Sequence, residues 1–176
     1  MLCKKLHHAA FRCRDARETV EFYTDVLGLK FSHAVGGDHV PSTGEYDPHI
    51  HVFFEMEDGS SIAFFEVPRG PGGMRDTTMA DWIQHFAFEV ADEDELEKAR
   101  AKLEERGLDV LGPVDHGFIR SIYFHDPSGH RLELTRRCPV PAEDVARAEA
   151  DAPRLLELWD RTHDWSQVAS GYNVHR

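Results

Sequence analysis

The chain has 176 residues, the size of one ordinary globular domain. Its 32 acidic residues outnumber the 20 basic ones, so the formal net charge is −12, which disfavours contact with nucleic-acid phosphates or anionic lipid. The N-terminal residues lack the apolar run of a signal peptide, and no segment has the ~20 consecutive apolar residues of a membrane span. The three cysteines have no metal-finger spacing. We therefore expect a cytoplasmic protein with free thiols that binds neither nucleic acid nor membrane.

Two segments of the chain repeat the same order of expected elements. Residues 6–11 and 83–88 are short apolar runs that favour β-strands. An aspartate follows each run at the N-cap position of an amphipathic helix, and each helix ends at a Gly-Leu pair. These caps and stops are Asp15 and Gly28 in the first half, and Asp92 and Gly107 in the second. The recurrence indicates an internal duplication.

Three more strands are expected after each helix. They lie at about 29–35, 49–56 and 61–67, and at about 108–114, 117–124 and 130–136. The fold class is therefore α+β, with two tandem βαβββ modules in a domain of residues 1–138. Module one covers about 5–67, a linker 68–81, and module two 82–137.

Residues 139–176 form a C-terminal helical extension outside the repeat. Apolar residues such as Val145, Leu155 and Trp159 recur there at helical spacing. Proline lacks the amide that a helix interior needs, so we expect an amphipathic helix that is interrupted at Pro153. Its apolar surface predicts packing on the domain or across a homodimer.

Three side chains at related places in the repeat predict a metal site. His8 and His85 occupy equivalent positions on the first strand of each module, and Glu133 is the one acid on the last strand. A carboxylate among apolar neighbours costs several kcal/mol unless a positive charge compensates it. Two imidazoles and one carboxylate form a facial triad that leaves coordination positions open. Each residue alone is more often structural, and only the repeat alignment favours His8 over His7.

Two longer segments resemble the vicinal oxygen chelate superfamily. Residues 21–29 are similar to its first helix and residues 120–129 to its final hairpin, and the resemblance covers residues 5–137. That superfamily includes glyoxalase I, methylmalonyl-CoA epimerase, thiol-transferring fosfomycin-resistance enzymes, bleomycin-resistance binders and type I extradiol dioxygenases. The resemblance implies an open half-barrel that holds a divalent metal and takes a small aromatic or vicinal-oxygen substrate. It determines the fold better than the reaction.

The number of ligands separates branches of this superfamily. Glyoxalase I and the epimerase carry a fourth protein ligand on the last strand of the first module. Aligning Gly59 with Gly129 places Ala63 opposite Glu133, and alanine cannot coordinate a metal. Glu66 would reach the same face only through a β-bulge. A three-ligand site for iron(II) is therefore expected, with manganese, nickel or zinc as alternatives.

The resemblance also implies two catalytic residues. Ring-cleaving members carry a Tyr ten residues before the metal-binding Glu, and Tyr123 stands at that distance from Glu133. His116 lies where the hydroquinone-cleaving branch has an Arg, and its ordinary pKa suits acid–base work. A structural tyrosine is the alternative for Tyr123. Phe53, Phe64 and Phe65 are expected to wall an apolar pocket for an aromatic ring.

The resulting hypothesis is an extradiol-type dioxygenase that cleaves a catechol or hydroquinone ring with O2. The alternatives are a glyoxalase-like lyase or isomerase, a thiol transferase that uses the metal as a Lewis acid, and a non-enzymatic small-molecule binder. His39 is expected in a loop that faces the substrate. His49 and His51 share a strand face that lines a cleft or is exposed.

Overall fold

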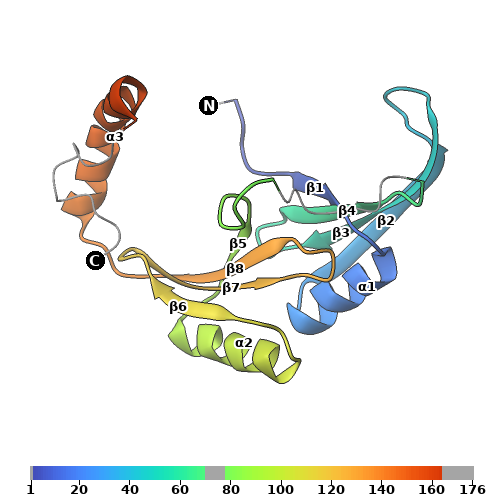
Figure 1. Ribbon diagram of the computed structural model, residues 1–176, viewed down its shortest axis with the longest axis horizontal. Coiled ribbons are helices and arrows are strands. Elements are labelled where there is room, and N and C mark those ends of the chain that lie inside the picture. Colours follow the sequence, from blue (N-terminus) through green and yellow to red (C-terminus); the bar gives the residue numbers. More distant parts are fainter. Residues whose placement is uncertain (1, 70–77, 164–176) are drawn as a thin grey trace.

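The computed structural model describes residues 2–69 and 78–163 (Figure 1). The first module consists of β1 (His8–Arg12), α1 (Ala16–Glu21), the π-helical turn η1 (Phe22–Val26), β2 (Lys30–His39), β3 (Tyr46–Glu55) and β4 (Ser61–Glu66). The second consists of β5 (Phe86–Glu89), α2 (Glu93–Glu105), β6 (Leu111–Asp115), β7 (Ile119–His125) and β8 (Arg131–Arg137). The extension forms α3 (Ala142–Thr162). Residues 70–77 of the linker and 164–176 of the extension lie outside the described residues.

The two modules have the same topology, which confirms the α+β fold of tandem βαβββ units. Their sheets have the orders β1-β4-β3-β2 and β5-β8-β7-β6, and the first strand of each module runs parallel to its last. Ala9 lies opposite Ile62 in one sheet, and Phe86 lies opposite Leu132 in the other. This shared register supports the equivalence of His8 and His85.

Each sheet has one face covered by a helix and one face that we call the open face. Figure 1 shows α1 and α2 on the same side of the two sheets, with α3 extending away from both. Because strand side chains alternate, residues of one parity pack against the helices. This core contains Tyr23, Val52, Phe54, Ile62, Phe64, Leu96, Leu103, Ile122, Phe124, Leu132 and Leu134. The intervening residues, including Glu133, belong to the open face.

Buried contacts join the modules. The Tyr23 hydroxyl donates a hydrogen bond to Asp126 Oδ2 at 3.1 Å, and both residues are buried. The His130 Nε2 donates to the carbonyl oxygen of Arg12 at 2.7 Å. Phe11 and Phe86 pack with ring centroids 4.2 Å apart. These contacts hold β1 close to the start of β5.

The hairpin of β2 and β3 is longer than the sequence predicted. Strand pairing continues to the pair His39–Tyr46, so the expectation that His39 lies in a loop is wrong. A Cβ at Gly36 would lie 2.9 Å from the carbonyl oxygen of His49. The absence of that Cβ lets the two backbones approach, so the glycine continues the hairpin rather than ending it.

The extension is one continuous helix, so the predicted interruption at Pro153 is wrong. Proline removes a single backbone hydrogen bond, to the carbonyl of Glu149, and that residue is exposed to water that can replace the bond. No residue of α3 is buried, and Val145, Leu156 and Trp159 are exposed. Packing across a homodimer stays a prediction. No helix within residues 2–69 and 78–163 is long and apolar enough to cross a membrane.

We expect Tyr23→Phe to lower the free energy of unfolding by about 1–3 kcal/mol, because it removes the only side-chain donor that the structure gives the buried Asp126 carboxylate among the described residues. Urea denaturation measures this change. Tyr46→Phe, at an exposed tyrosine, is the matched control and should change stability little. Equal effects of the two substitutions would contradict the role given to this hydrogen bond.

Candidate metal centre

His85 and Glu133 meet on the open face of the second sheet. The strand β5 begins at Phe86, later than predicted, so His85 lies at its entrance. Glu133 lies in the middle of β8, where its Cα partner on β5 is Ala87. The His85 Nε2 is 3.0 Å from Glu133 Oε2. The parallel pairing of β5 and β8 therefore brings together two of the three predicted ligands.

The Glu133 carboxylate is nearly removed from water. The residue is 3% exposed, and its second oxygen, Oε1, is buried and has no hydrogen-bond partner among the described residues. A buried carboxylate needs a compensating positive charge, which a protonated His85 or a divalent cation can supply. The orphaned oxygen beside an imidazole nitrogen fits the donor set of such a cation.

His8, the third predicted ligand, is not part of this pair. It lies on the open face of the first sheet, with its ring centroid 5.5 Å from Phe53 and 6.0 Å from His51. Its Nδ1 is 2.8 Å from the Nδ1 of His7. Among the described residues no three His, Cys, Asp or Glu side chains form a group that could hold a metal ion. The complete triad of His8, His85 and Glu133 therefore stays a prediction.

The first module offers no carboxylate at the position of Glu133. Ala63 pairs with Ala10 and Phe53, as Glu133 pairs with Ala87 and Tyr123. The nearby Glu66 accepts a hydrogen bond from the backbone amide of Ala16 at 2.7 Å, at the start of α1. Its carboxylate is thus engaged at a helix N-terminus rather than on the open face.

The two predicted catalytic residues lie in contact beside Glu133. Tyr123 faces Glu133 across β7 and β8, and its hydroxyl oxygen is 2.8 Å from His116 Nε2. The ring centroids of His85 and Tyr123 are 6.1 Å apart. Burial and the charge of Glu133 raise the pKa of the Tyr123 phenol. The geometry provides a hydrogen-bonded acid–base pair next to a carboxylate and an imidazole.

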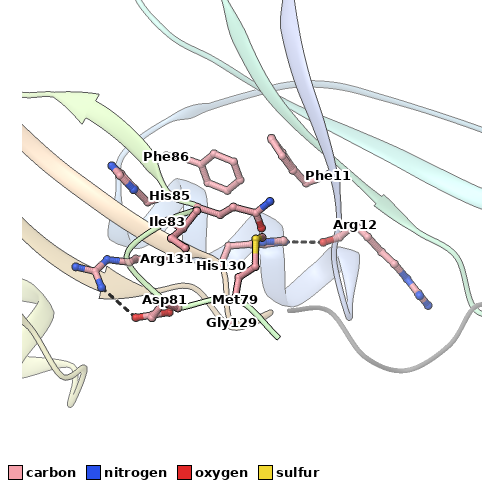
Figure 2. Close-up of a pocket in the computed structure, with 12 residues that line it drawn as sticks. Phe11, Arg12, Met79, Asp81, Ile83, His85, Phe86, Gly129, His130 and Arg131 are labelled. Atoms are coloured by element: carbon pink, nitrogen blue, oxygen red, sulfur yellow. Dashed lines mark hydrogen bonds and ion pairs between the residues drawn. The ribbon is translucent and has the colours of Figure 1, made fainter. Parts of the chain in front are cut away.

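The sequence analysis did not single out Arg131 and Asp81. The Arg131 guanidinium carbon lies 4.5 Å from the centre of the Tyr123 ring, and its Nη1 is 3.0 Å from Asp81 Oδ2. Figure 2 shows this ion pair at one side of a cavity of about 610 Å3. His85 also lines the cavity. Strand alternation places Arg131 on the face of Glu133, whereas nothing in the sequence connects Asp81 of the linker to it.

The first sheet has an aromatic open face. Phe53 and Phe65 belong to it, because the ring of His51 stacks on Phe65 at 3.5 Å and lies 4.1 Å from Phe53. The expectation that Phe64 also walls a pocket is wrong, since it is fully buried against Tyr23 in the core. His49 also contacts Phe65, so it shares the face of His51 as predicted.

His51 is 6% exposed, and its Nε2 is buried with no hydrogen-bond partner in the part of the chain that the structure describes. Burial, followed by repulsion from His8, His49 and His33, lowers the pKa of the imidazole to about 4. The neutral ring is therefore the form that the folded protein favours.

Residues 5–134 match the model of the Glyoxalase/Bleomycin resistance protein/Dioxygenase superfamily. The chain belongs to this superfamily. It is 27% identical over 131 residues to biphenyl-2,3-diol 1,2-dioxygenase 3 of Rhodococcus globerulus, covering 74% of this chain and 62% of the relative. It is 26% identical over 176 residues to lactoylglutathione lyase GLX1 of Arabidopsis thaliana, covering 90% of this chain and 54% of the relative. The chain thus spans less than two thirds of the length of either enzyme.

A solved structure has the same fold. The glyoxylase/bleomycin resistance protein/dioxygenase domain from Frankia sp. EAN1pec superposes with a TM-score of 0.63 at 20% identity, over 77% of this chain and 99% of that one. The superfamily relatives include both dioxygenases and lyases, so family membership leaves the reaction open.

The stability of the metal-free protein should depend on pH through His51. Its folded pKa of about 4 lies below the usual value of 6.5, so the folded state binds fewer protons than the unfolded state. The contribution of the neutral His51 to the free energy of unfolding is complete above pH 6.5 and is lost as the pH falls toward 4. His51→Phe keeps the stacked ring and should flatten the fall in unfolding free energy between these values, measured by urea titration with a chelator present. His39→Phe, at an exposed imidazole, should leave the slope as it is. An unchanged slope in His51→Phe would contradict the assignment.

The purified protein should bind about one divalent ion per chain, as one mononuclear site requires. Glu133→Gln and His85→Ala should each abolish this binding, because they remove the two donors that already meet, while circular dichroism shows an intact fold. Metal analysis after dialysis is the measurement, and Glu89→Gln, on an exposed carboxylate of β5, is the matched control. Stoichiometric metal in Glu133→Gln would overturn the site. Loss of binding in His7→Ala but not in His8→Ala would shift the third ligand by one residue.

Proposed function

We propose that the chain is a metal-dependent dioxygenase that opens the ring of a catechol or hydroquinone with O2. The observation that carries the proposal is the His116–Tyr123 hydrogen bond of 2.8 Å beside the His85–Glu133 pair. This hydrogen bond places a proton-exchanging pair of side chains next to the two residues best suited to bind a metal. A dioxygenase of aromatic diols is among the relatives.

His85 and Glu133, with His8 as the third ligand, would hold the metal. Iron(II) is expected, with manganese, nickel or zinc as alternatives. The bound ion would supply Lewis acidity toward the oxygens of a diphenol and a position for O2. A three-residue site leaves room for both molecules, and Ala63 provides no fourth donor.

His116 and Tyr123 would manage the protons of the substrate. A diphenol must release a hydroxyl proton to bind as a phenolate, and His116 can accept it at Nε2 once Tyr123 turns its hydroxyl toward the substrate. The Tyr123 phenol, with its pKa above the usual 10, is protonated at neutral pH and can donate a hydrogen bond to a phenolate oxygen. Phe53 on the opposite sheet offers an apolar surface for the ring.

The lactoylglutathione lyase relative supports a second candidate, a lyase or thiol transferase that uses the metal only as a Lewis acid. A further carboxylate that acts as a base or as a fourth ligand would favour such a reaction. Glu66 is the acid nearest that position in sequence, and its hydrogen bond to the amide of Ala16 holds it elsewhere. The dioxygenase is therefore the better supported proposal.

Iron(II)-loaded protein prepared without oxygen should consume O2 with a catechol or hydroquinone and release a ring-opened product that carries both oxygen atoms. Tyr123→Phe and His116→Ala should each lower turnover about 10²–10⁴-fold, the usual contribution of acid–base catalysis, and leave metal content unchanged. An oxygen electrode with absorption spectroscopy measures the rate. His39→Ala, on an exposed imidazole of the hairpin, is the matched control.

Two results would contradict this assignment. Turnover of a hemithioacetal with nickel, cobalt or zinc, together with no oxygen uptake on any diphenol, would place the chain in the lyase branch. Tight binding of an aromatic ligand by the metal-free protein, without turnover of either substrate class, would indicate a binding protein.

A further inference from the structure

Asp81 of the linker contacts two side chains on the open face of the second sheet. Its Oδ2 accepts a hydrogen bond from Arg131 Nη1 at 3.0 Å, and its Oδ1 lies 3.1 Å from His125 Nε2. Figure 2 shows the ion pair with Arg131. His125 and Arg131 lie opposite each other on β7 and β8, the two central strands of the sheet. One carboxylate thus fastens the linker to both central strands.

Arg131 is the more buried member of this ion pair. Its side chain is 13% exposed, and its Nε is buried with no hydrogen-bond partner among the described residues. Removing one partner of an ion pair in such a place is costly, because the other charge is left uncompensated. The pair Arg137–Glu89 lies further along the same face, but its side chains are 79% and 54% exposed, and exposed pairs contribute little. The Asp81–Arg131 pair is therefore the stronger restraint.

Arg131 in turn packs on the ring of Tyr123. The guanidinium carbon lies 4.5 Å from the centre of the ring, within the range of a cation–π contact. The hydroxyl oxygen of the same tyrosine is 2.8 Å from His116 Nε2. A tyrosine that is held at both its ring and its hydroxyl keeps few alternative orientations. The direction of the hydroxyl therefore depends on Arg131.

Asp81 also restrains the segment that carries His85, which lies four residues later. The pairing of β5 with β8 begins at Phe86, so His85 precedes the first strand pair. The chain turns before it, with the amide of Ile83 donating to the carbonyl of Ala80 at 3.1 Å. Strand pairing therefore does not fix the imidazole by itself. The attachment of Asp81 to β7 and β8 limits where this turn can place it.

We propose that the Asp81–Arg131 ion pair positions the candidate site from two sides, holding Tyr123 through Arg131 and His85 through the linker. Both members of the pair act through their neighbours, so they are positioning residues. Displacements are costly at such a site, because its side chains must stay within about 0.5 Å of the productive geometry. The inference rests on the proposed function and adds the element that aligns the acid–base pair with the metal-binding pair.

A direct effect of the two charges on a bound cation would have a different signature. Arg131→Gln removes a positive charge near Glu133, which by itself would tighten the binding of a cation. Asp81→Asn removes a negative charge and would weaken it. Loss of positioning predicts weaker binding in both variants. The double variant Asp81→Asn/Arg131→Gln keeps the net charge, so its affinity reports positioning without the change in charge.

Calorimetric titration of the metal-free protein with zinc ions tests the effect on His85. Both single variants should bind zinc more weakly than the wild type. The double variant should bind it about tenfold more weakly, the lower end of the cost of losing a contact that orients a metal ligand. Glu89→Gln/Arg137→Gln, which removes the exposed pair and also keeps the net charge, is the matched control and should bind zinc as the wild type does. Tighter binding in Arg131→Gln, or wild-type affinity in the double variant, would overturn the inference.

NMR of protein that carries isotope-labelled tyrosine tests the effect on Tyr123 without metal. The chain has four tyrosines, so the Tyr123 signals can be assigned from their loss in Tyr123→Phe. These signals should shift in Asp81→Asn, because Arg131 loses its anchor. The same substitution in the Arg131→Gln background should add no further shift. Unchanged Tyr123 signals in Asp81→Asn, or equal shifts in both backgrounds, would overturn the inference.

The two experiments separate this inference from the proposed function. A wild type that binds no zinc would contradict the metal centre, and the tyrosine signals would then decide the inference. Zinc binding by the wild type, together with either overturning result, would leave the dioxygenase assay unaffected. If Arg131→Gln fails to fold, Asp81→Asn is compared with Glu89→Gln. These two variants lose the same charge, so the inference requires the larger loss of zinc affinity in Asp81→Asn.

Discussion

A carboxylate that is almost completely removed from water constrains the chemistry of the second module. The Glu133 side chain lies on β8, a central strand of the second sheet, with one oxygen against His85 and the other without a hydrogen-bond partner within residues 2–69 and 78–163. Transfer of an uncompensated carboxylate to such a site would destabilise the fold by about several kcal/mol. The neighbouring imidazole and a divalent cation are the two ways to avoid that cost.

The duplicated fold explains how the open faces of the two sheets came to differ. Both modules place a first-strand histidine and a last-strand residue at the same register, but the last-strand residue is Ala63 in one and Glu133 in the other. Without an acid, the first module fills its open face with stacked rings such as His51 and Phe65. One copy thus supplies charge and the other an apolar surface, the combination that a small-molecule site requires.

Much of this arrangement was predictable from the sequence, because the features repeat. Capping aspartates, glycine stops and the spacing of strands specified the two modules. Their alignment selected His85 together with His8, and Glu133 was selected as the one acid on the last strand. The structure brings these two into contact and adds the Tyr123–His116 hydrogen bond beside them.

The remaining features depend on contacts between distant segments. Gly36 marks a close approach of two strands rather than a strand end, and Pro153 is accommodated in an exposed helix. Asp81 reaches Arg131 from a linker whose path no periodic pattern encodes. The position of His8 likewise follows from how the sheets pack, which strand periodicity does not specify.

The most direct test of the account is a crystal structure of the protein loaded with a divalent metal, with the ion located by its anomalous scattering. The account predicts one ion bonded to Glu133 and to the Nε2 of His85 at about 2.0–2.2 Å, with the direct His85–Glu133 contact replaced by bonds to the metal and His8 as the third protein ligand. An ion bound instead among the histidines of the first sheet, with the His85–Glu133 contact intact, would contradict it.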